Sequence, residues 1–417
     1  MLSDKAADAN YKSRQYEPNE LYKRYGVEFD LDRYESLLSM EQQSYADFGR
    51  LASEIAARLK MKFDVVIGDN GIVSGGSEHL RKVNAGALLE GILNEEESRF
   101  NAFAREFAKD AFVLDVPEGA KASISVLFLS GATVAPLLIS VNAGSGAKLT
   151  LSEVFASQQS KAMTGMLQYI SGGEHSMVEV NMLHTEESGA VGFSILKAAA
   201  QESASIVMNS LYAGGTVHKQ HNELSATGDN SHIESNEVIV GVDAQKLDMY
   251  TGLLNAGRGS VSTSETKVVA LDSSSVIAKG MAKVLHGSKK SISYLKERGL
   301  IYDKGAQIKM MPDMSIDESD VKATHSSSVS PINEDDIFYI SARGVKREEA
   351  KKIVVGGFML ETLGKIKDQR IRSTAAAIAI SRLKERGMGV PEIDLKDAWA
   401  SQASNQQEQF SEAYKFR

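Results

Sequence analysis

The chain of 417 residues contains no cysteine. Disulfide bonds and thiolate metal sites within the chain are therefore excluded. A chain without disulfides fits a reducing compartment, and residues 1–12 lack the apolar core of a secretory signal. We therefore expect a cytoplasmic protein.

The sequence has no basic excess and no obvious membrane-spanning run. Its formal net charge is −8, so electrostatics give no reason to expect a nucleic-acid partner. The longest uncharged stretch, residues 122–147, contains Pro136, Asn142 and several glycines, and its apolar residues alternate in places. This pattern predicts two buried strands around a turn and no membrane association.

Signatures of nucleotide binding and hydrolysis are also absent. The sequence has no GxxxxGK[ST] loop, no GxGxxG after a strand, no GxSxG elbow and no HExxH pair. The segment HGSKKS, residues 286–291, lacks the upstream glycine that a phosphate loop needs. We therefore expect a protein that is not an enzyme.

Large aromatic residues are scarce in this sequence, which also contains a long region with a β-like pattern. Aromatic residues make up 7% of the chain, with a single tryptophan. Between residues 111 and 319, short runs of Val, Ile, Leu and Thr alternate with polar residues, and small-residue turns recur at often similar intervals, for example at Ser203, Asp243 and Gly259. Even spacing of short strands over some 200 residues, with few core aromatics, favours a β-solenoid over a sandwich.

Helical periodicity is predicted on both sides of this region. Residues 31–60 and 95–110 carry apolar stripes at helical spacing, and Asp69-Asn70-Gly71 is a hairpin signal between them. After Pro331, Asn333 can cap a helix that ends at Arg343-Gly344, and further helices are predicted over 346–365 and 373–386. These patterns predict three regions: a mostly helical region 1–110, a β core 111–332 and a C-terminal helical region 333–417.

Histidine positions are the first candidates for a site. His218 and His221 are three residues apart in a β-like context, so their side chains would point to opposite faces, and we interpret them and nearby His232 as a polar rim or loop. His325 stands in DVKATHSSSVS, residues 320–330, which we interpret as a serine-rich turn after a strand. Its residue type alone gives His325 no function.

Residues 293–358 carry a more specific pattern. They resemble the C-terminal core of the SufB/SufD family, the scaffold subunits of the SUF iron–sulfur cluster assembly system. The positions that match the family pattern without a gap include Ser293, Tyr294, Arg298, Leu300, Ala306, Pro312, Ile316, Asp320, Val321, His325, Val329, Ile332, Phe338, Tyr339, Arg343, Gly344, Ala350, Gly357 and Phe358. A fainter resemblance extends over residues 64–365.

The resemblance implies a fold and partners. Family members have a central right-handed parallel β-helix between helical N-terminal and C-terminal regions, and pair through the β-helix as homodimers or SufB/SufD-type heterodimers. Their C-terminal helices dock on a SufC-like ABC ATPase, which agrees with the missing phosphate loop. By resemblance the docking residues here are Asp335, Asp336, Phe338, Tyr339, Arg343 and Gly344.

The resemblance also gives His325 a meaning. The matching histidine of the family lies at the subunit interface where a nascent cluster is proposed to form. The cysteine of SufB-type members is replaced here by Glu297, and the acidic residue after the histidine by Ser326. The chain therefore looks like a SufD-like or archaeal-type member without cysteine.

Two hypotheses follow for this site. In one, His325 and Glu297 hold iron or a transient iron–sulfur cluster, weakly because no cysteine is available. In the other, the chain has lost cluster binding and only completes the complex, with His325 in a structural role.

A different class stays open as an alternative. Parallel β-helices also occur in carbohydrate-active enzymes and adhesin-like binding proteins, and Asp313, Asp317 and Asp320 could supply an acidic pair for sugar chemistry. Fold analogy is the only support for this alternative.

Overall fold

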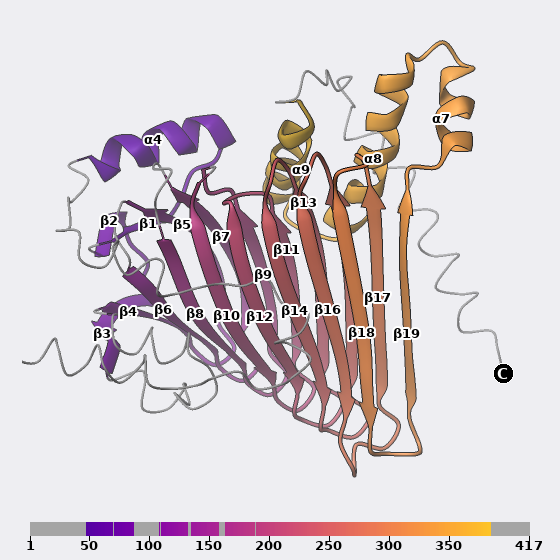
Figure 1. Cartoon of the computed structure of the whole chain (residues 1–417). Coiled ribbons are helices and arrows are strands. Elements are labelled where there is room, and N and C mark those ends of the chain that lie inside the picture. Colours follow the sequence, from indigo (N-terminus) through magenta and orange to yellow (C-terminus); the bar gives the residue numbers. More distant parts are fainter. Residues whose placement is uncertain are drawn as a thin grey trace, which may run out of the picture.

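The chain forms one long stack of parallel β-coils, seen in a computed structural model (Figure 1). The structure describes residues 47–69, 71–86, 108, 110–131, 135–157, 163–187 and 189–384. Successive strands alternate between two facing sheets, so that each pair of strands makes one coil of a solenoid. The predicted class, a mainly β protein with a parallel β-solenoid between helical regions, is confirmed; the right-handedness stays a prediction.

The first sheet holds the odd-numbered strands of the solenoid. In the described residues its spatial order is β19-β17-β15-β13-β11-β9-β7-β5-β1-β2. The bounds are β1 Val65–Gly68, β2 Gly71–Gly75, β5 Lys121–Ser130, β7 Lys148–Ser157, β9 Met177–His184, β11 Ser205–Tyr212, β13 His232–Gly241, β15 Val261–Ala270, β17 Ile292–Ile301 and β19 Lys322–Pro331.

Among the described residues, the second sheet holds the even-numbered strands of the solenoid and β3, in the order β18-β16-β14-β12-β10-β8-β6-β4-β3. The bounds are β3 Leu80–Asn84, β4 Asp110–Val116, β6 Ala135–Ala143, β8 Met163–Gly172, β10 Val191–Ala200, β12 Val217–Ala226, β14 Lys246–Asn255, β16 Ser275–Val284 and β18 Gln307–Ile316. The two strands expected within residues 122–147 are therefore confirmed as β5 and β6.

The N-terminal end of the stack departs from parallel pairing. Strands β1 and β2 form the antiparallel hairpin that the Asp69-Asn70-Gly71 signal predicts, and β3 pairs with β4 antiparallel. From β5 onward the coils are in register over as many as ten residue pairs for each pair of strands.

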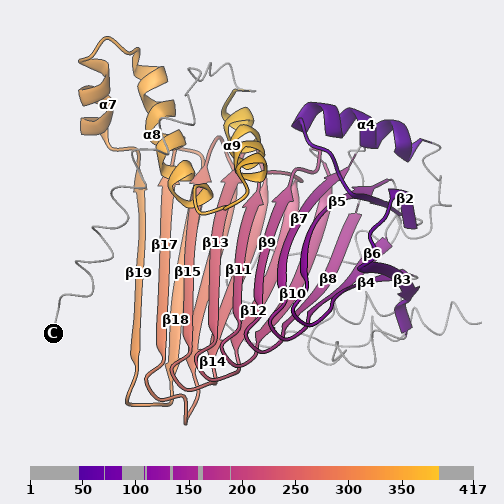
Figure 2. The same cartoon turned by 180° about the vertical axis from the view of Figure 1, so that it is seen from behind.

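Burial on both faces explains why hydrophobic and polar residues do not alternate in some strands of the first sheet. In β7 one face points into the solenoid, yet nearly every residue of the strand is buried. The outer face of this sheet is covered by helices at the carboxyl ends of its strands (Figure 2). Strands covered on both faces read as continuous apolar runs, which is why the alternation fades in segments such as residues 126–129.

The described part of the chain contains four helices, which lie along one side of the solenoid (Figure 2). They are α4 Phe48–Leu59, α7 Glu334–Ser341, α8 Arg347–Leu363 and α9 Gln369–Lys384. Helices α4, α8 and α9 share one apolar cluster with the outer face of the first sheet. The predicted helices over 346–365 and 373–386 correspond to α8 and α9, with α9 beginning four residues earlier than predicted.

Lysine side chains fix the C-terminal helical region to the sheet. Lys267, fully buried on the outer face of β15, donates to the Phe358 carbonyl oxygen at 2.9 Å and pairs with Glu361 of α8. Lys365 lies 3.0 Å from a Glu265 carboxylate oxygen and 2.7 Å from the Asn236 amide oxygen. One lysine thus links two neighbouring strands to the turn after α8.

Two predictions made from helical patterns fall wholly or mostly outside these residues. They are the first part of the 31–60 helix and most of the 95–110 stripe. The division into regions 1–110, 111–332 and 333–417 stays a prediction. No helix among the described residues is both long and apolar enough to span a membrane.

Candidate functional site at the terminal coil

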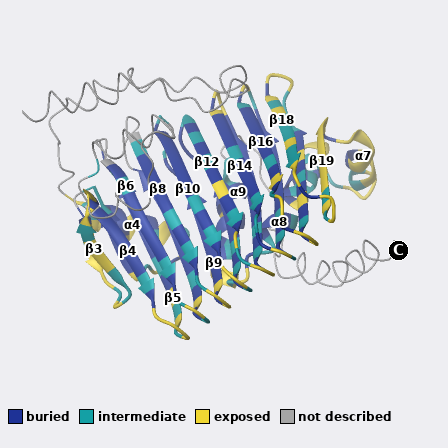
Figure 3. Ribbon diagram, turned by 90° about the horizontal axis from the view of Figure 1, so that it is seen from below, coloured by how far each residue is buried: buried dark blue, intermediate teal, exposed yellow. Residues whose placement is uncertain are grey.

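The last coil of the solenoid leaves two strand edges without a neighbouring strand. β18 ends one sheet and β19 ends the other, and each pairs on one side only with a described strand. Every residue of β19 except Ala323 is exposed, and Figure 3 shows this exposure against the buried coils behind it. A ten-residue edge strand with free backbone donors and acceptors is a template for another chain.

His325 lies within β19, so the prediction of a serine-rich turn is wrong. The strand is stabilised by parallel pairing with β17, in which Leu295 is opposite His325 and Glu297 is opposite Ser327. In-register residues of adjacent strands point to the same face, as do residues two apart on one strand. His325 and Glu297 therefore share the face directed into the solenoid.

Strand geometry brings the two residues within reach of one ligand. With strands about 4.8 Å apart and a rise of about 3.3 Å per residue, their Cα atoms are separated by about 8 Å. The imidazole is exposed at the end of the stack, whereas the carboxyl group is buried one coil deeper. An ion at the end of the solenoid could meet both groups.

The Glu297 carboxyl group is buried in a recess inside the solenoid. It packs over Gly280 of β16, where an added Cβ would lie 2.7 Å from a Glu297 oxygen and 2.6 Å from Leu295. Burial raises the pKa of Glu297 to about 7, while a hydrogen bond from Ser327 acts in the opposite direction. Its Oε2 atom has no hydrogen-bond partner among the described residues. Glu297 can thus change protonation near neutral pH.

A second buried acid, Glu237, lies behind this recess. In-register pairing stacks Glu237, Thr266, Glu297 and Ser327 on four successive strands of one sheet. Five side chains donate hydrogen bonds to the Glu237 carboxylate: Gln220, Asn222, Ser235, Thr251 and Thr266. Sequence reasoning missed this polar interior, because an isolated Glu in a strand pattern is usually placed on the solvent face.

The histidines predicted to form a polar rim occupy three environments. His218 is buried inside the solenoid, so the rim or loop interpretation is wrong for it; burial and neighbouring His184 lower its pKa to about 3. Its Nε2 lies 3.2 Å from the Ser194 hydroxyl. His221 points outward from β12 and contacts Glu223 at 3.0 Å, so the expectation of opposite faces is confirmed. His232 begins β13, with Nδ1 3.2 Å from the Ser205 hydroxyl.

No complete metal site is present in these coils. Across residues 47–384, with the gaps given above, no group of three or more His, Asp or Glu side chains could hold a metal ion. His325 and Glu297 therefore offer at most two protein ligands from one chain. A three- or four-ligand centre at this place would need groups from another molecule.

The residues predicted to contact a partner all lie on or just after α7. Asn333 caps this helix by accepting a hydrogen bond from the Asp335 amide at 3.1 Å, as predicted. Ile337 faces the protein, whereas Phe338 and Tyr339 are 73% and 60% exposed. Asp335, Asp336, Arg343 and Gly344 are also exposed, and the Arg343 guanidinium stacks on the Tyr339 ring at 3.5 Å.

The architecture defines a class: a parallel β-solenoid protein with an open terminal coil and a small helical unit beside it. Residues 130–358 match the family domain described as "SUF system FeS cluster assembly, SufBD core domain". This match covers more than half of the chain and includes Glu297, His325 and α7. The chain therefore belongs to the SufBD family.

Several curated proteins are similar over part of their length. The iron–sulfur cluster assembly protein SufD of Bacillus subtilis is 24% identical over 226 residues, 54% of this chain and 51% of that protein. SufD of Escherichia coli is 23% identical over 239 residues, 57% and 56% of the two chains. An iron–sulfur cluster assembly SufBD family protein of Methanothermobacter thermautotrophicus is 28% identical over 134 residues, 32% of each chain. The chain spans about half the length of the two SufD proteins.

Proposed function

We propose that this chain is a non-enzymatic scaffold subunit of a SUF-type iron–sulfur cluster assembly complex in the cytoplasm. The observation that carries this proposal is the family match over residues 130–358, which runs from the end of β5 into α8. The similar SufD proteins are named for iron–sulfur cluster assembly. In this role iron and sulfide are cargo.

The terminal coil is the proposed contact with a second scaffold subunit, either another copy of this chain or a SufB/SufD-type partner. Both sheets present an open edge there, and the coil exposes the apolar side chains of Ile316 and Val329. Exposed edges are usually shielded by charges, proline or another element. Pairing with a second solenoid would satisfy both edges at once.

The same contact would complete an iron-binding site. His325 and Glu297 together supply an imidazole and a carboxylate, which iron accepts, and a partner or sulfide would supply the remaining ligands. Thiolates ordinarily hold such clusters, so a His/Glu half-site would be weak and would release its cargo readily. The second hypothesis, a structural partner that holds no iron, predicts the same dimer without cargo.

Helix α7 is the proposed docking surface for a SufC-like ABC ATPase. Its exposed aromatic pair lies beside Arg343, and aromatic and Arg residues are enriched at interface hot spots. The chain has no phosphate loop of its own, so ATP hydrolysis would belong to the partner.

The carbohydrate alternative has little support beside this proposal. Asp313 is exposed on β18, and Asp317 and Asp320 lie in the turn that follows, on the coil that matches the SufBD core. Cleavage of a polysaccharide by the purified chain, without binding to an ABC-type ATPase, would revive this alternative.

The test is anaerobic reconstitution of the chain with iron and sulfide, alone and with its cognate SufC-like ATPase. Wild type is compared with His325→Ala, and with Ser328→Ala as a matched exposed change on the same strand. Size-exclusion chromatography reports the complex; absorbance and iron analysis report the cargo.

The outcomes separate the hypotheses. Co-elution with a chromophore that His325→Ala loses and Ser328→Ala keeps supports an iron-holding scaffold. Co-elution without a chromophore supports the structural partner. If the chain forms no complex with the ATPase and holds no iron, the proposed function is wrong.

A further inference from the structure

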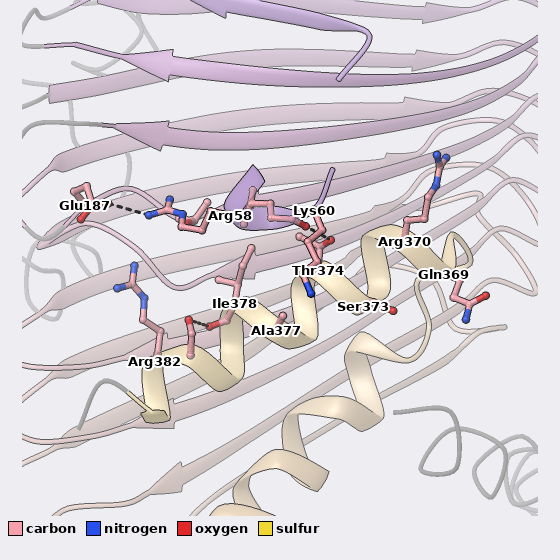
Figure 4. A pocket seen from close by; sticks show the side chains of 13 residues that line it. Arg58, Lys60, Glu187, Gln369, Arg370, Ser373, Thr374, Ala377, Ile378 and Arg382 are labelled. Carbon is pink, nitrogen blue, oxygen red and sulfur yellow. Dashed lines mark hydrogen bonds and ion pairs between the residues drawn. The ribbon is translucent and has the colours of Figure 1, made fainter. Parts of the chain in front are cut away.

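A groove of about 700 Å³ lies between α4, α9 and the turn after β9 (Figure 4). This volume is within the range of small-molecule sites, roughly 300–1,000 Å³. The end of α4 contributes Arg58 to Lys60, the turn contributes Thr185 and Glu187, and α9 forms the other wall. Both helices lie outside residues 130–358, so only the turn after β9 belongs to the matched SufBD core.

Positive charge dominates this groove although the whole chain is acidic. Among the described residues that line it, four are cationic, namely Arg58, Lys60, Arg370 and Arg382, and one is acidic, Glu187. The chain as a whole has a net charge of −8. Cations gathered against the overall charge create a local field that attracts anions.

Two of these four cations form ion pairs with neighbouring acidic residues. Arg58 contacts Glu187 at 3.3 Å across the mouth of the groove, and both side chains are about half exposed. Arg370 contacts Asp368 at 3.3 Å, and Arg382 donates to the Glu186 carbonyl oxygen at 3.5 Å. Lys60 makes no ion pair with any residue that the structure describes.

An anion in the groove would be bound by the cationic side chains and not by the backbone amides at the start of α9. The Asp368 carboxylate already accepts hydrogen bonds from the Arg370 and Ile371 amides at the start of α9, at 2.7 and 3.3 Å. Hydroxyl groups of Ser373, Thr374 and Ser381 also line the groove.

The aliphatic residues that line the rest of the groove indicate which chemical groups the ligand does not carry. Leu59, Ala377 and Ile378 supply aliphatic surface, and none of the described residues that line the groove is aromatic. A nucleobase would therefore have no ring to stack on. Guanidinium groups with hydroxyls match the oxygens of a phosphoryl group, which accept several charge-assisted hydrogen bonds.

We propose that the groove between α4 and α9 binds a small phosphoryl-bearing anion. The anion would lie between the end of α4 and the α9 wall, and would compete with Glu187 for Arg58. Because α4 precedes the solenoid and α9 follows it, such a ligand would join two parts of the chain far apart in sequence. This inference does not depend on the iron–sulfur function.

The test is isothermal titration of the full chain with inorganic pyrophosphate at low ionic strength, where charge contacts are least screened. The double variant Arg58→Gln/Lys60→Gln removes two exposed cations and should weaken binding by about tenfold or more. Glu187→Gln removes the competing carboxylate and should tighten binding. Arg50→Gln is the matched control, since Arg50 is exposed on the same helix but pairs with Glu54 and does not line the groove.

The results that would overturn the proposal are distinct. One is the absence of heat with both pyrophosphate and inorganic phosphate at millimolar concentration. Another is equal affinity in the double variant and wild type. Tighter binding of citrate than of pyrophosphate would reject the phosphoryl class, and binding of a polyglutamate peptide alone would make the groove a surface for an acidic protein segment.

Discussion

At the scale of single residues, the buried carboxyl groups of the solenoid connect stability to pH. Glu297 keeps its proton up to a pKa of about 7 in the folded chain, against an ordinary value of 4.5. Between these values the folded chain binds more protons than the unfolded chain. The free energy of unfolding therefore decreases as the pH rises from about 4.5 to about 7.

We predict that Glu297→Gln stabilises the apo chain at pH 8 and leaves it nearly unchanged at pH 4. The amide resembles the protonated carboxyl group, so it removes the need to bury a charge. The gain should be at most about 3.5 kcal/mol, at about 1.4 kcal/mol per pKa unit. Urea unfolding at the two pH values measures it.

Glu237→Gln is the matched contrast for this prediction. The Glu237 carboxylate accepts hydrogen bonds from five side chains, so an amide would direct its own donors at other donors. We expect it to destabilise the chain by about 1–3 kcal/mol at pH 8. Equal effects of the two substitutions at pH 8 would show that the two recesses do not differ as described.

At the residue level, the sequence predicted a local helix cap but not the burial of polar groups. Asn333 as a helix cap follows from local chemistry alone. The burial of His218 and Glu237 does not, because it depends on donors from strands that lie one coil away or on the opposite sheet. The family resemblance singled out Glu297, but its recess over Gly280 requires the coil geometry.

At the scale of elements, helix α7 has an aliphatic residue that packs against the protein and two aromatic residues that face the solvent. Ile337 is buried against the protein, whereas Phe338 and Tyr339 project outward. We predict that Phe338→Ala/Tyr339→Ala weakens binding to the proposed SufC-like ATPase partner by about tenfold or more, as expected for aromatic hot spots. Titration calorimetry with the purified ATPase measures this loss.

The fold should tolerate that double substitution. Exposed side chains contribute little to stability, so the melting temperature should change by only a few degrees or less. Ile337→Ala, one position away, should instead destabilise the chain, since a buried Ile→Ala change costs about 2–5 kcal/mol. Unchanged affinity in the double variant would remove α7 from the docking surface.

The exposed edge of strand β19 leads to a separate prediction about the association of this chain with a second scaffold subunit. Val329 is 39% exposed on the terminal coil, and Val329→Lys would place a charge on the edge. Inward-facing charges on edges block pairing between strands. We expect this variant to shift a dimer toward monomer in sedimentation velocity experiments.

The opposite end of the same sheet supplies a matched control. Ile72 on the edge strand β2 is 43% exposed, so Ile72→Lys adds the same charge to the other edge. If the interface lies at the terminal coil as proposed, Ile72→Lys should leave the association state of the chain unchanged. A loss of the dimer in Ile72→Lys alone would move the interface to the hairpin end.

Elements with regular patterns were predicted, and the irregular strand was not. Strands β5 and β6 and helices α7 to α9 show clear periodicity and turn signals. Strand β19 was interpreted as a turn because serine dominates it and it buries little apolar surface. Its strand form comes from pairing with β17, a tertiary effect that local propensity cannot show.

At the scale of the whole molecule, the stack has the one-dimensional character of repeat proteins. Each coil contacts mainly the coils before and after it, so stability is close to a sum of coil and interface terms. Among the described strands, those of the terminal coil have a neighbour on one side only. We predict that backbone amides of β19 exchange with solvent faster than those of β11 or β13, as measured by hydrogen–deuterium exchange. Equal protection of these strands would show that the stack opens as a single unit.

The open end of the solenoid also affects the stability of the terminal coil. Repeat proteins need a terminal capping repeat, since the last repeat otherwise exposes surface meant for a successor. A subunit docked on β18 and β19 would serve as that cap. The thermal stability of the terminal coil would then increase with partner concentration, as mass action requires. The coil that holds His325 would be most ordered in the assembled complex and least ordered in an orphan subunit, which would couple the site to assembly.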